Sequence, residues 1–201
     1  MVRLLCPLLA GALALMTMTG CVTVNVPDQP DVERDPTART VEDGVETWDL
    51  TGEPTAEALG IPSDRMSADY RSDEPRRIVL QLEGGRSLRF EAPLLSFTRS
   101  RGAGGDAFTL GSRGATVAPE DLGTQLAELT EQLTGDPDPG IESFLAAVAQ
   151  APDEQTERVR YSSPEQVYGD LTLGVSADVA PIAGAGRFVV GGAWAVPTSE
   201  G

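Results

Sequence analysis

The residue types available for chemistry in this chain are mainly carboxylates and arginines. Among 201 residues there are 31 aspartates and glutamates and 15 basic residues, and every base is arginine, because the sequence has no lysine and no histidine. Without histidine or lysine, serine–histidine, cysteine–histidine and serine–lysine catalysis are excluded. A carboxylate-dependent hydrolase is the least favoured alternative: Glu128 and Glu131, for example, fall opposite a leucine stripe and are predicted to be a solvated helix face. We therefore expect a protein that is not an enzyme.

Two further motifs suggest ligands but fit loops better. The acidic segment 136–142 suggests a calcium loop, yet the sixth and twelfth positions of such a loop hold Ile141 and Ala147 instead of glycine and a carboxylate. The glycine-rich segment 102–107 fits the pattern G-x-G-x-x-A, but a strand-like segment follows it instead of a helix. A zinc site would need carboxylates alone, since histidine is absent. We predict neither a cofactor nor a metal.

Charge is unevenly distributed along the chain, whose net charge is −16 at pH 7. Such an acidic chain would repel nucleic acid phosphates, so no nucleic acid partner is expected. Residues 76–113 nevertheless hold seven arginines and three acids, whereas 114–157 hold ten acids and no base. We predict a patch for an anionic group, such as an envelope polymer or a lipid headgroup, formed by Arg77, Arg89, Arg99 and Arg101. The alternative is that these arginines decorate an open sheet face and neutralise the acidic segment before them.

The first twenty residues are typical of an export signal. Arg3 precedes an apolar stretch from Leu4 to Met18, which is fifteen residues long. A helix needs roughly 20 apolar residues to span a bilayer, so a cleaved signal peptide is favoured over a membrane anchor. No later stretch of the sequence is long and apolar enough to span.

The residues that end this stretch are Met18-Thr19-Gly20-Cys21. They resemble the lipobox of bacterial lipoproteins, in which a small residue precedes the lipidated cysteine, although leucine is more usual where Met18 stands. The resemblance implies that the Cys21 thiol receives a diacylglyceryl group, that residues 1–20 are removed together with Cys6, and that the new amine is acylated. Several acyl chains hold a protein durably, whereas one holds it marginally. A lipid-anchored protein on the extracytoplasmic face of the cell membrane is thereby implied.

The stretch that follows, residues 21–75, is predicted to be an acidic tether. Its part from Val22 to Pro75 holds six prolines, fourteen acids and four arginines. A proline-broken, like-charged segment buries too little apolar surface to fold alone. We expect at least Val22–Val45 to be a spacer and Glu46–Pro75 to lie against the domain as a partly ordered arm.

Residues 76–201 are predicted to be an α+β domain. Alternating apolar residues at 78–82 and 88–92 predict a hairpin whose three-residue loop, 83–85, pairs Leu80 with Leu88 and Ile78 with Phe90. Short strands at 95–97 and 108–110 follow. A leucine stripe from Pro119 onward and a second apolar stripe at 141–148 predict two antiparallel helices. The remaining strands are expected at 159–161, 171–179 and 188–196, with Leu173 near Trp194 and Val175 over Gly192.

These elements predict an antiparallel sheet of hairpins with an αα-hairpin packed on one face, preceded by a disordered tether. We therefore expect a non-enzymatic docking module that binds an envelope protein or polymer, since such a protein needs only an anchor, a spacer and a folded domain. The alternative is a carrier in which sheet and helices part to admit a lipid or another apolar ligand.

Overall fold

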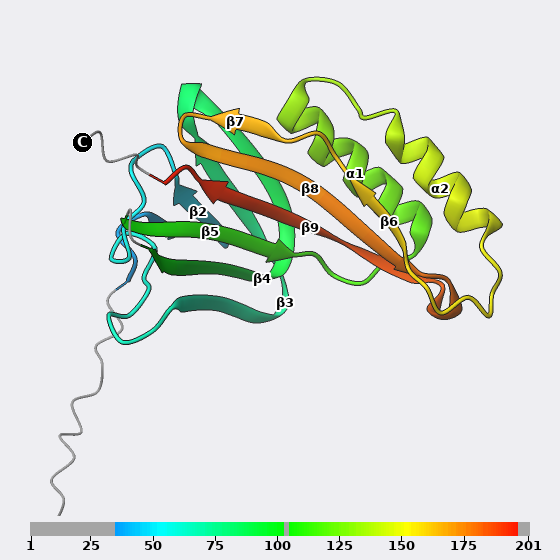
Figure 1. Cartoon of the computed structure of the whole chain (residues 1–201), viewed down its shortest axis with the longest axis horizontal. Helices are drawn as coiled ribbons and strands as arrows, with labels where there is room; N and C mark the ends of the chain where they lie inside the picture. The colour runs from blue at the N-terminus through cyan, green and yellow to red at the C-terminus, as the bar shows by residue number, and fades with distance from the viewer. Residues whose placement is uncertain (1–34, 103–104, 197–201) are drawn as a thin grey trace, which may run out of the picture. The chain divides into compact units, whose positions relative to one another are not determined.

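The computed structural model describes residues 35–102 and 105–196, which belong to one compact unit spanning 33–201 (Figure 1). The predicted signal peptide, Cys21 and the first part of the predicted tether lie outside the described residues. Within the described residues one sheet contains the strands β1 (Arg39–Glu42), β2 (Val45–Asp49), β3 (Ser67–Leu82), β4 (Arg86–Gly102), β5 (Gly105–Arg113), β6 (Val159–Ser162), β7 (Gln166–Tyr168), β8 (Leu171–Ala180) and β9 (Ala185–Trp194). The helices are α1 (Pro119–Thr134) and α2 (Gly140–Gln150), with 3₁₀ turns at Glu83–Gly85 and Pro181–Ala183.

The strand order is β1-β2-β3-β4-β5-β9-β8-β6, and β7 pairs with β8 beside β6. The architecture is α+β, with many more residues in strands than in helices. The expectation of a purely antiparallel sheet is wrong, because β2 runs parallel to β3 while the other pairs are antiparallel. The irregular segment between β2 and β3 carries the chain back to the start of β3, and this return makes the parallel pairing possible.

The segment before residue 76 contributes two strands to the sheet: β1 falls within the stretch expected to be a spacer, and most of β2 falls within the arm expected to lie against the domain. Residues 39–49 form β1 and β2, and Trp48 is fully buried. Glu46 is also buried: it forms ion pairs with Arg39, at 3.2 Å, and with Arg76, and it accepts a hydrogen bond of 2.7 Å from Trp48 Nε1. A buried carboxylate is tolerated when it is paired and hydrogen-bonded. The acidic composition of this segment therefore does not keep it unfolded.

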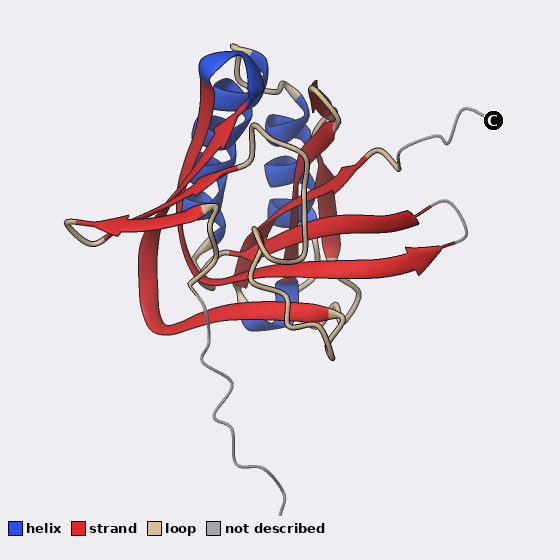
Figure 2. Ribbon diagram, turned by 90° about the vertical axis from the view of Figure 1, so that its left-hand side faces the viewer, coloured by secondary structure: helices blue, strands red, loops and turns tan. Residues whose placement is uncertain are grey.

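The β3–β4 hairpin has the predicted register around its turn, with Ile78 opposite Phe90 and Leu80 opposite Leu88. The turn glycine Gly84 has φ of 76° and Gly85 has φ of 74°, a conformation that favours glycine. Further from the turn the pairing is interrupted between residues 71 and 76, and both strands bend there (Figures 1 and 2). The tip of the hairpin, residues 76–92, consequently turns away from β5.

The two helices fill the space beside this bent hairpin. Leu122, Leu126, Leu129 and Leu133 form the buried stripe of α1, and α1 ends at Gly135, whose φ is 95°. Residues 135–139 link α1 to α2, which lies next to it (Figure 1). α1 contacts β4, β8 and β9, and α2 contacts β6. No helix of the described residues has both the length and the apolar character needed to cross a membrane.

Two tyrosines bond strands to the end of α1 and to the link that follows it. Tyr161 of β6 donates a hydrogen bond of 2.8 Å to Asp138 Oδ2, and Tyr168 of β7 donates one of 2.8 Å to the Leu133 carbonyl. Burial raises the pKa of Tyr161, and the hydrogen bond to Asp138 raises it further. The pKa of Tyr168 is also raised by burial. Both hydroxyls are therefore held in the neutral form that donates these bonds.

The last hairpin keeps the predicted face but shifts by two residues. Leu171 lies opposite Trp194 and Leu173 opposite Gly192, whereas the sequence predicted Leu173 near Trp194. The expected loop ran from 181 to 186, but the strands continue to the pair Ala180–Ala185. The 3₁₀ turn after Ala180 makes the loop two residues shorter. An even shift leaves every side chain on its expected face.

Candidate functional site

The four arginines expected to form one patch lie in two separate places. Arg99 is 7% exposed, and its guanidinium donates to the Arg65 carbonyl at 2.9 Å and to the Ser63 carbonyl at 3.3 Å. It also lies 3.8 Å from Asp106. Arg101 is exposed and donates to the same Ser63 carbonyl, at 3.5 Å. These two arginines hold the 63–65 turn in place, and Arg99 offers no open surface to a ligand.

Arg99 is buried because the inward-facing positions of β4 change along the strand. Near the hairpin tip, Phe90 and Ala92 face the core, whereas after Pro93 the buried residues are Leu95, Phe97 and Arg99. The strand bends where the alternation changes. As a result, Arg89 faces outward at one end of β4 and Arg99 faces inward at the other.

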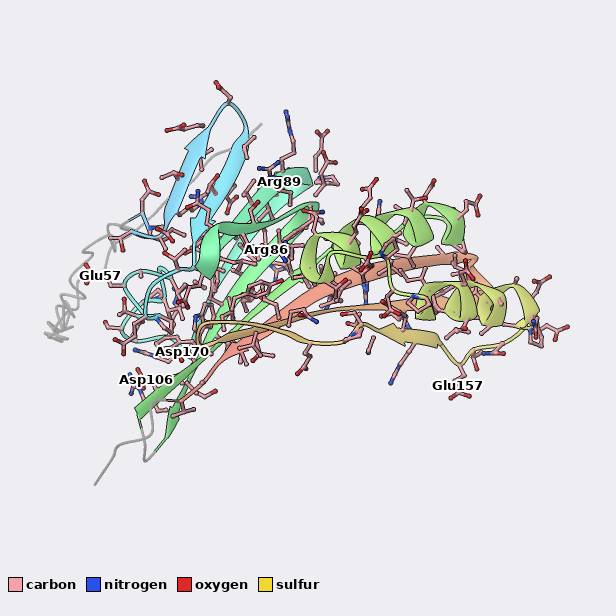
Figure 3. The ribbon with its side chains drawn as sticks, turned by 90° about the horizontal axis from the view of Figure 1, so that it is seen from above. Glu57, Arg86, Arg89, Asp106, Glu157 and Asp170 are labelled. Carbon is pink, nitrogen blue, oxygen red and sulfur yellow. The ribbon has the colours of Figure 1, made fainter. Side chains whose placement is uncertain are left out.

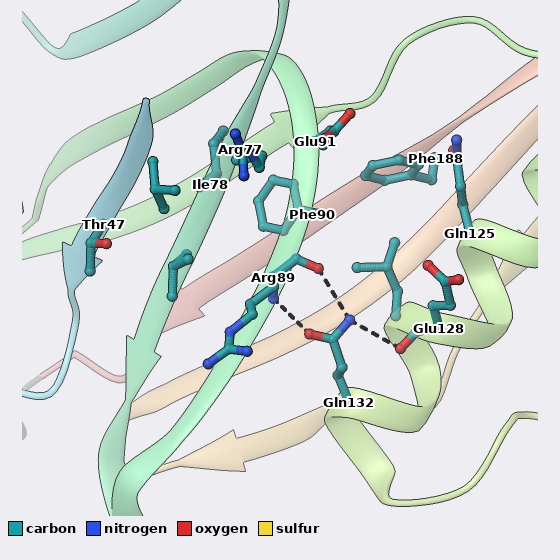
Figure 4. A pocket seen from close by; sticks show the side chains of 13 residues that line it. Thr47, Arg77, Ile78, Arg89, Phe90, Glu91, Gln125, Glu128, Gln132 and Phe188 are labelled. Atoms are coloured by element: carbon teal, nitrogen blue, oxygen red, sulfur yellow. Dashed lines mark hydrogen bonds between the residues drawn. The ribbon is translucent and has the colours of Figure 1, made fainter. Parts of the chain in front are cut away.

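Arg77 and Arg89 line a groove of about 770 Å³ between the β3–β4 hairpin and α1 (Figure 4). Figure 3 shows Arg89 beside α1, far from Asp106, the ion-pair partner of Arg99. Both groove arginines are exposed, and neither guanidinium has a hydrogen bond or ion pair with another described residue. The groove is further lined by Val45, Thr47, Ile78, Val79, Phe90, Glu91, Gln125, Glu128, Leu129, Gln132 and Phe188.

One end of the groove is closed by Gln132 of α1. Its side-chain amide accepts a hydrogen bond of 2.8 Å from the Arg89 N–H and donates one of 3.1 Å to the Arg89 carbonyl (Figure 4). The same amide nitrogen donates to the Glu128 carbonyl at 3.2 Å. A glutamine side chain thus bonds to both polar groups of one strand residue, as a neighbouring strand would.

β4 has room for such a bond because its tip has a neighbour on one side only. Residues 86–92 pair with β3, but pairing with β5 begins at Leu94. Toward Glu91 and Gln125 the strand and the helix diverge (Figure 4). Phe90, Leu129 and Phe188, all buried, form the floor between them. The groove is therefore a slot between an open strand edge and a helix.

The polar groups around the slot are balanced in charge. Arg77 and Arg89 are matched by Glu91 and Glu128, and Glu91 lies directly opposite Arg77 in the sheet. Gln125 Oε1 is shielded from solvent and accepts no hydrogen bond from any described residue. A buried acceptor without a donor is unfavourable.

The slot presents its charged side chains to solvent. Its carboxylates, Glu91 and Glu128, are exposed, and the described residues contain no cluster of histidine, cysteine or acidic side chains suited to a metal ion. What the slot offers is a short apolar floor, free charges of both signs and a strand edge that no other strand covers. These are the elements of a recognition surface.

The sequence prediction missed Gln125 and Gln132. The two glutamines are seven residues apart on α1, and therefore on one helix face, next to the leucine stripe. That spacing was visible in the sequence. The strand edge that they face was not, because it depends on the bend of β3 and β4.

In comparisons with known proteins, no family model, curated protein sequence or solved structure matches the chain.

Proposed function

We propose that this chain is a lipid-anchored, extracytoplasmic docking module without enzymatic activity, and that it binds its envelope partner in the slot between β4 and α1. The observation that carries the proposal is the slot itself. It combines an open strand edge, a buried apolar floor, and two free arginines, Arg77 and Arg89. The lipobox resemblance at Met18–Cys21 supports the anchor.

An apolar-ligand carrier receives less support from the same geometry. The floor residues are closely packed: Phe90 is 8% exposed, and Leu129 and Phe188 are 2% exposed. An acyl chain gains affinity from the apolar surface that it buries, and little is offered while α1 stays against the sheet. A partner that also contacts the polar residues around the slot, such as Arg77 and Arg89, gains more binding free energy.

The anchor is tested by replacing Cys21 with alanine in the full chain. We expect the Cys21→Ala protein to leave the membrane fraction or to remain uncleaved, because no thiol is left to receive the diacylglyceryl group. Membrane fractionation and the mass of the recovered protein report both effects. If the variant is processed normally and stays with the membrane, the anchor is wrong.

The docking site is tested by site-specific photocrosslinking in intact cells. A photoreactive residue replaces Glu128, which lines the slot, or Glu131, which is exposed on the same helix outside it. We expect a discrete adduct from position 128, a weaker one or none from 131, and loss of the adduct when Arg77 and Arg89 are both changed to glutamine. Equal labelling from the two positions, or an adduct that is indifferent to the arginines, would refute the site.

A further inference from the structure

We propose that the partner enters the slot as an extended peptide that adds a strand to the open edge of β4. The proposal rests on the docking function and specifies its mode. Strand addition needs unpaired backbone donors and acceptors in a row, with a place for alternate side chains. The residues around Arg89 provide both.

The direction of the free backbone groups follows from Gln132. Because the Arg89 N–H and carbonyl both bond to that amide, they point away from β3. In a regular antiparallel pair every second residue points the same way, and the register from Arg86 to Ala92 is regular. The N–H and carbonyl of Glu91 therefore point into the slot as well. No strand pairs with Glu91 on that side, because the pairing of β4 with β5 begins at Leu94.

The Gln132 amide shows how a peptide group would bind here. It presents one donor and one acceptor to Arg89, as a residue of a paired strand does. A peptide that continues from this point toward Glu91 would pair with the vacant groups. The other side of the peptide would face α1, whose Gln125 and Glu128 line the opposite wall.

The side chains around the edge define the chemistry of the peptide. A residue opposite Phe90 shares its face and would lie over the floor formed with Leu129 and Phe188, so it is apolar. The residues on either side share the faces of Arg89 and Glu91, whose charges are unpaired. We therefore assign an extended segment in which an apolar residue lies between an acidic and a basic one.

The edge can be blocked without disturbing the fold. Glu91→Pro removes an N–H on the side of β4 that no strand covers, and proline is tolerated on an edge strand when its N–H side faces outward. Glu91→Gln is the matched control, since it removes the charge and keeps the N–H. Gln132→Ala acts in the opposite direction, because it removes the group that competes with the peptide for Arg89.

The probe is a library of random heptapeptides displayed on phage and selected on the full chain in non-ionic detergent. Enriched peptides are synthesised and titrated against the three variants. We expect Glu91→Pro to weaken binding by at least about tenfold, through a lost hydrogen bond and the obstructing ring. Glu91→Gln should weaken it by no more than about threefold, which is the loss of one exposed ion pair, and Gln132→Ala should strengthen it. Methylating successive peptide nitrogens should abolish binding at every second position, and this readout needs no protein variant.

The inference is overturned if no peptide is enriched, if methylation shows no alternation, or if Glu91→Pro folds and binds as the parent does. These results would leave the docking function intact wherever the photocrosslink from Glu128 still depends on Arg77 and Arg89. Loss of that photocrosslink dependence would instead remove the proposed function, and with it the basis of strand addition.

Discussion

Replacing Glu46 measures how much the segment before β3 contributes to the free energy of unfolding. The perturbation is Glu46→Ala in the full chain. It removes the acceptor of the Trp48 indole N–H, 2.7 Å away, and the anion shared by Arg39 and Arg76. A hydrogen bond to a charged group contributes roughly 1.5–3 kcal/mol. Removing one partner of a buried ion pair costs about 3–5 kcal/mol.

The arginines are only partly buried, so water limits the loss. Their side chains are 26% and 18% exposed, against 3% for Glu46. We therefore expect the free energy of unfolding to fall by about 3 kcal/mol, near the lower end of the range for a broken buried pair. That is a large fraction of the roughly 5–15 kcal/mol of an ordinary domain. Glu42→Ala, at an exposed site in β1, is the control and should change it by less than about 0.5 kcal/mol.

The assay is urea unfolding followed by tryptophan fluorescence and far-ultraviolet circular dichroism. The chain has two tryptophans, so a Trp194→Phe background isolates the signal of Trp48. One cooperative transition seen by both methods is expected. The reasoning is refuted if Glu46→Ala loses less than about 1 kcal/mol, or if the Trp48 signal changes at lower urea than the circular dichroism.

Two further outcomes follow from the same contacts. Gln132→Ala should lower the free energy of unfolding by about 1–2 kcal/mol in urea titrations, because two bonds to Arg89 are lost, and an unchanged value would contradict the capping role of this side chain. The raised pKa of Tyr161 means that its stabilisation is complete below its ordinary value of 10.0 and is lost as the pH rises through the folded-state pKa. Urea midpoints should therefore fall above about pH 10, and less steeply in Tyr161→Phe, where an identical slope would count against burial of this hydroxyl.

Local pattern predicted the elements whose partners are close in sequence. The alternation around Leu80 and Leu88 defined a hairpin whose register follows from its own turn, and the leucines of α1 defined the buried face of a helix. In each case the period of the apolar residues and the turn chemistry carried enough information. The pairing of β2 with β3 lacked both signals.

The sequence placed the segment with Glu46 against the domain but did not predict its strands, because their partners are distant in the sequence. Six prolines and an excess of acid describe residues 22–75 as a whole, yet one carboxylate is neutralised by Arg76 and one indole is buried in the core. The overall composition of the segment does not reveal the few residues that pack against the domain. The exposed acids keep their charge in water, while Glu46 is stabilised by arginines that come from two different strands.

The candidate site was predictable only in part. Arg77 and Arg89 were expected on an outward face, and they lie there. Arg99 was not expected to be buried, although it continues the alternation of Leu95 and Phe97. The slot itself requires a bend in two long strands and a helix that fills the gap. Neither feature is contained in the pattern of any single segment.

The pairing of β5 with β9 determines when the sheet can be completed. Thr109 and Ala193 are opposite each other, and the whole stretch with both helices and β6 to β8 lies between them in the chain. While the chain emerges from a ribosome or a translocation channel, β5 has its β4 neighbour long before its second one. Its other edge stays available to foreign strands throughout that interval. Closing so long a loop also slows folding. The C-terminal strand therefore limits the rate at which the sheet forms and sets the time during which the β5 edge is exposed to other strands.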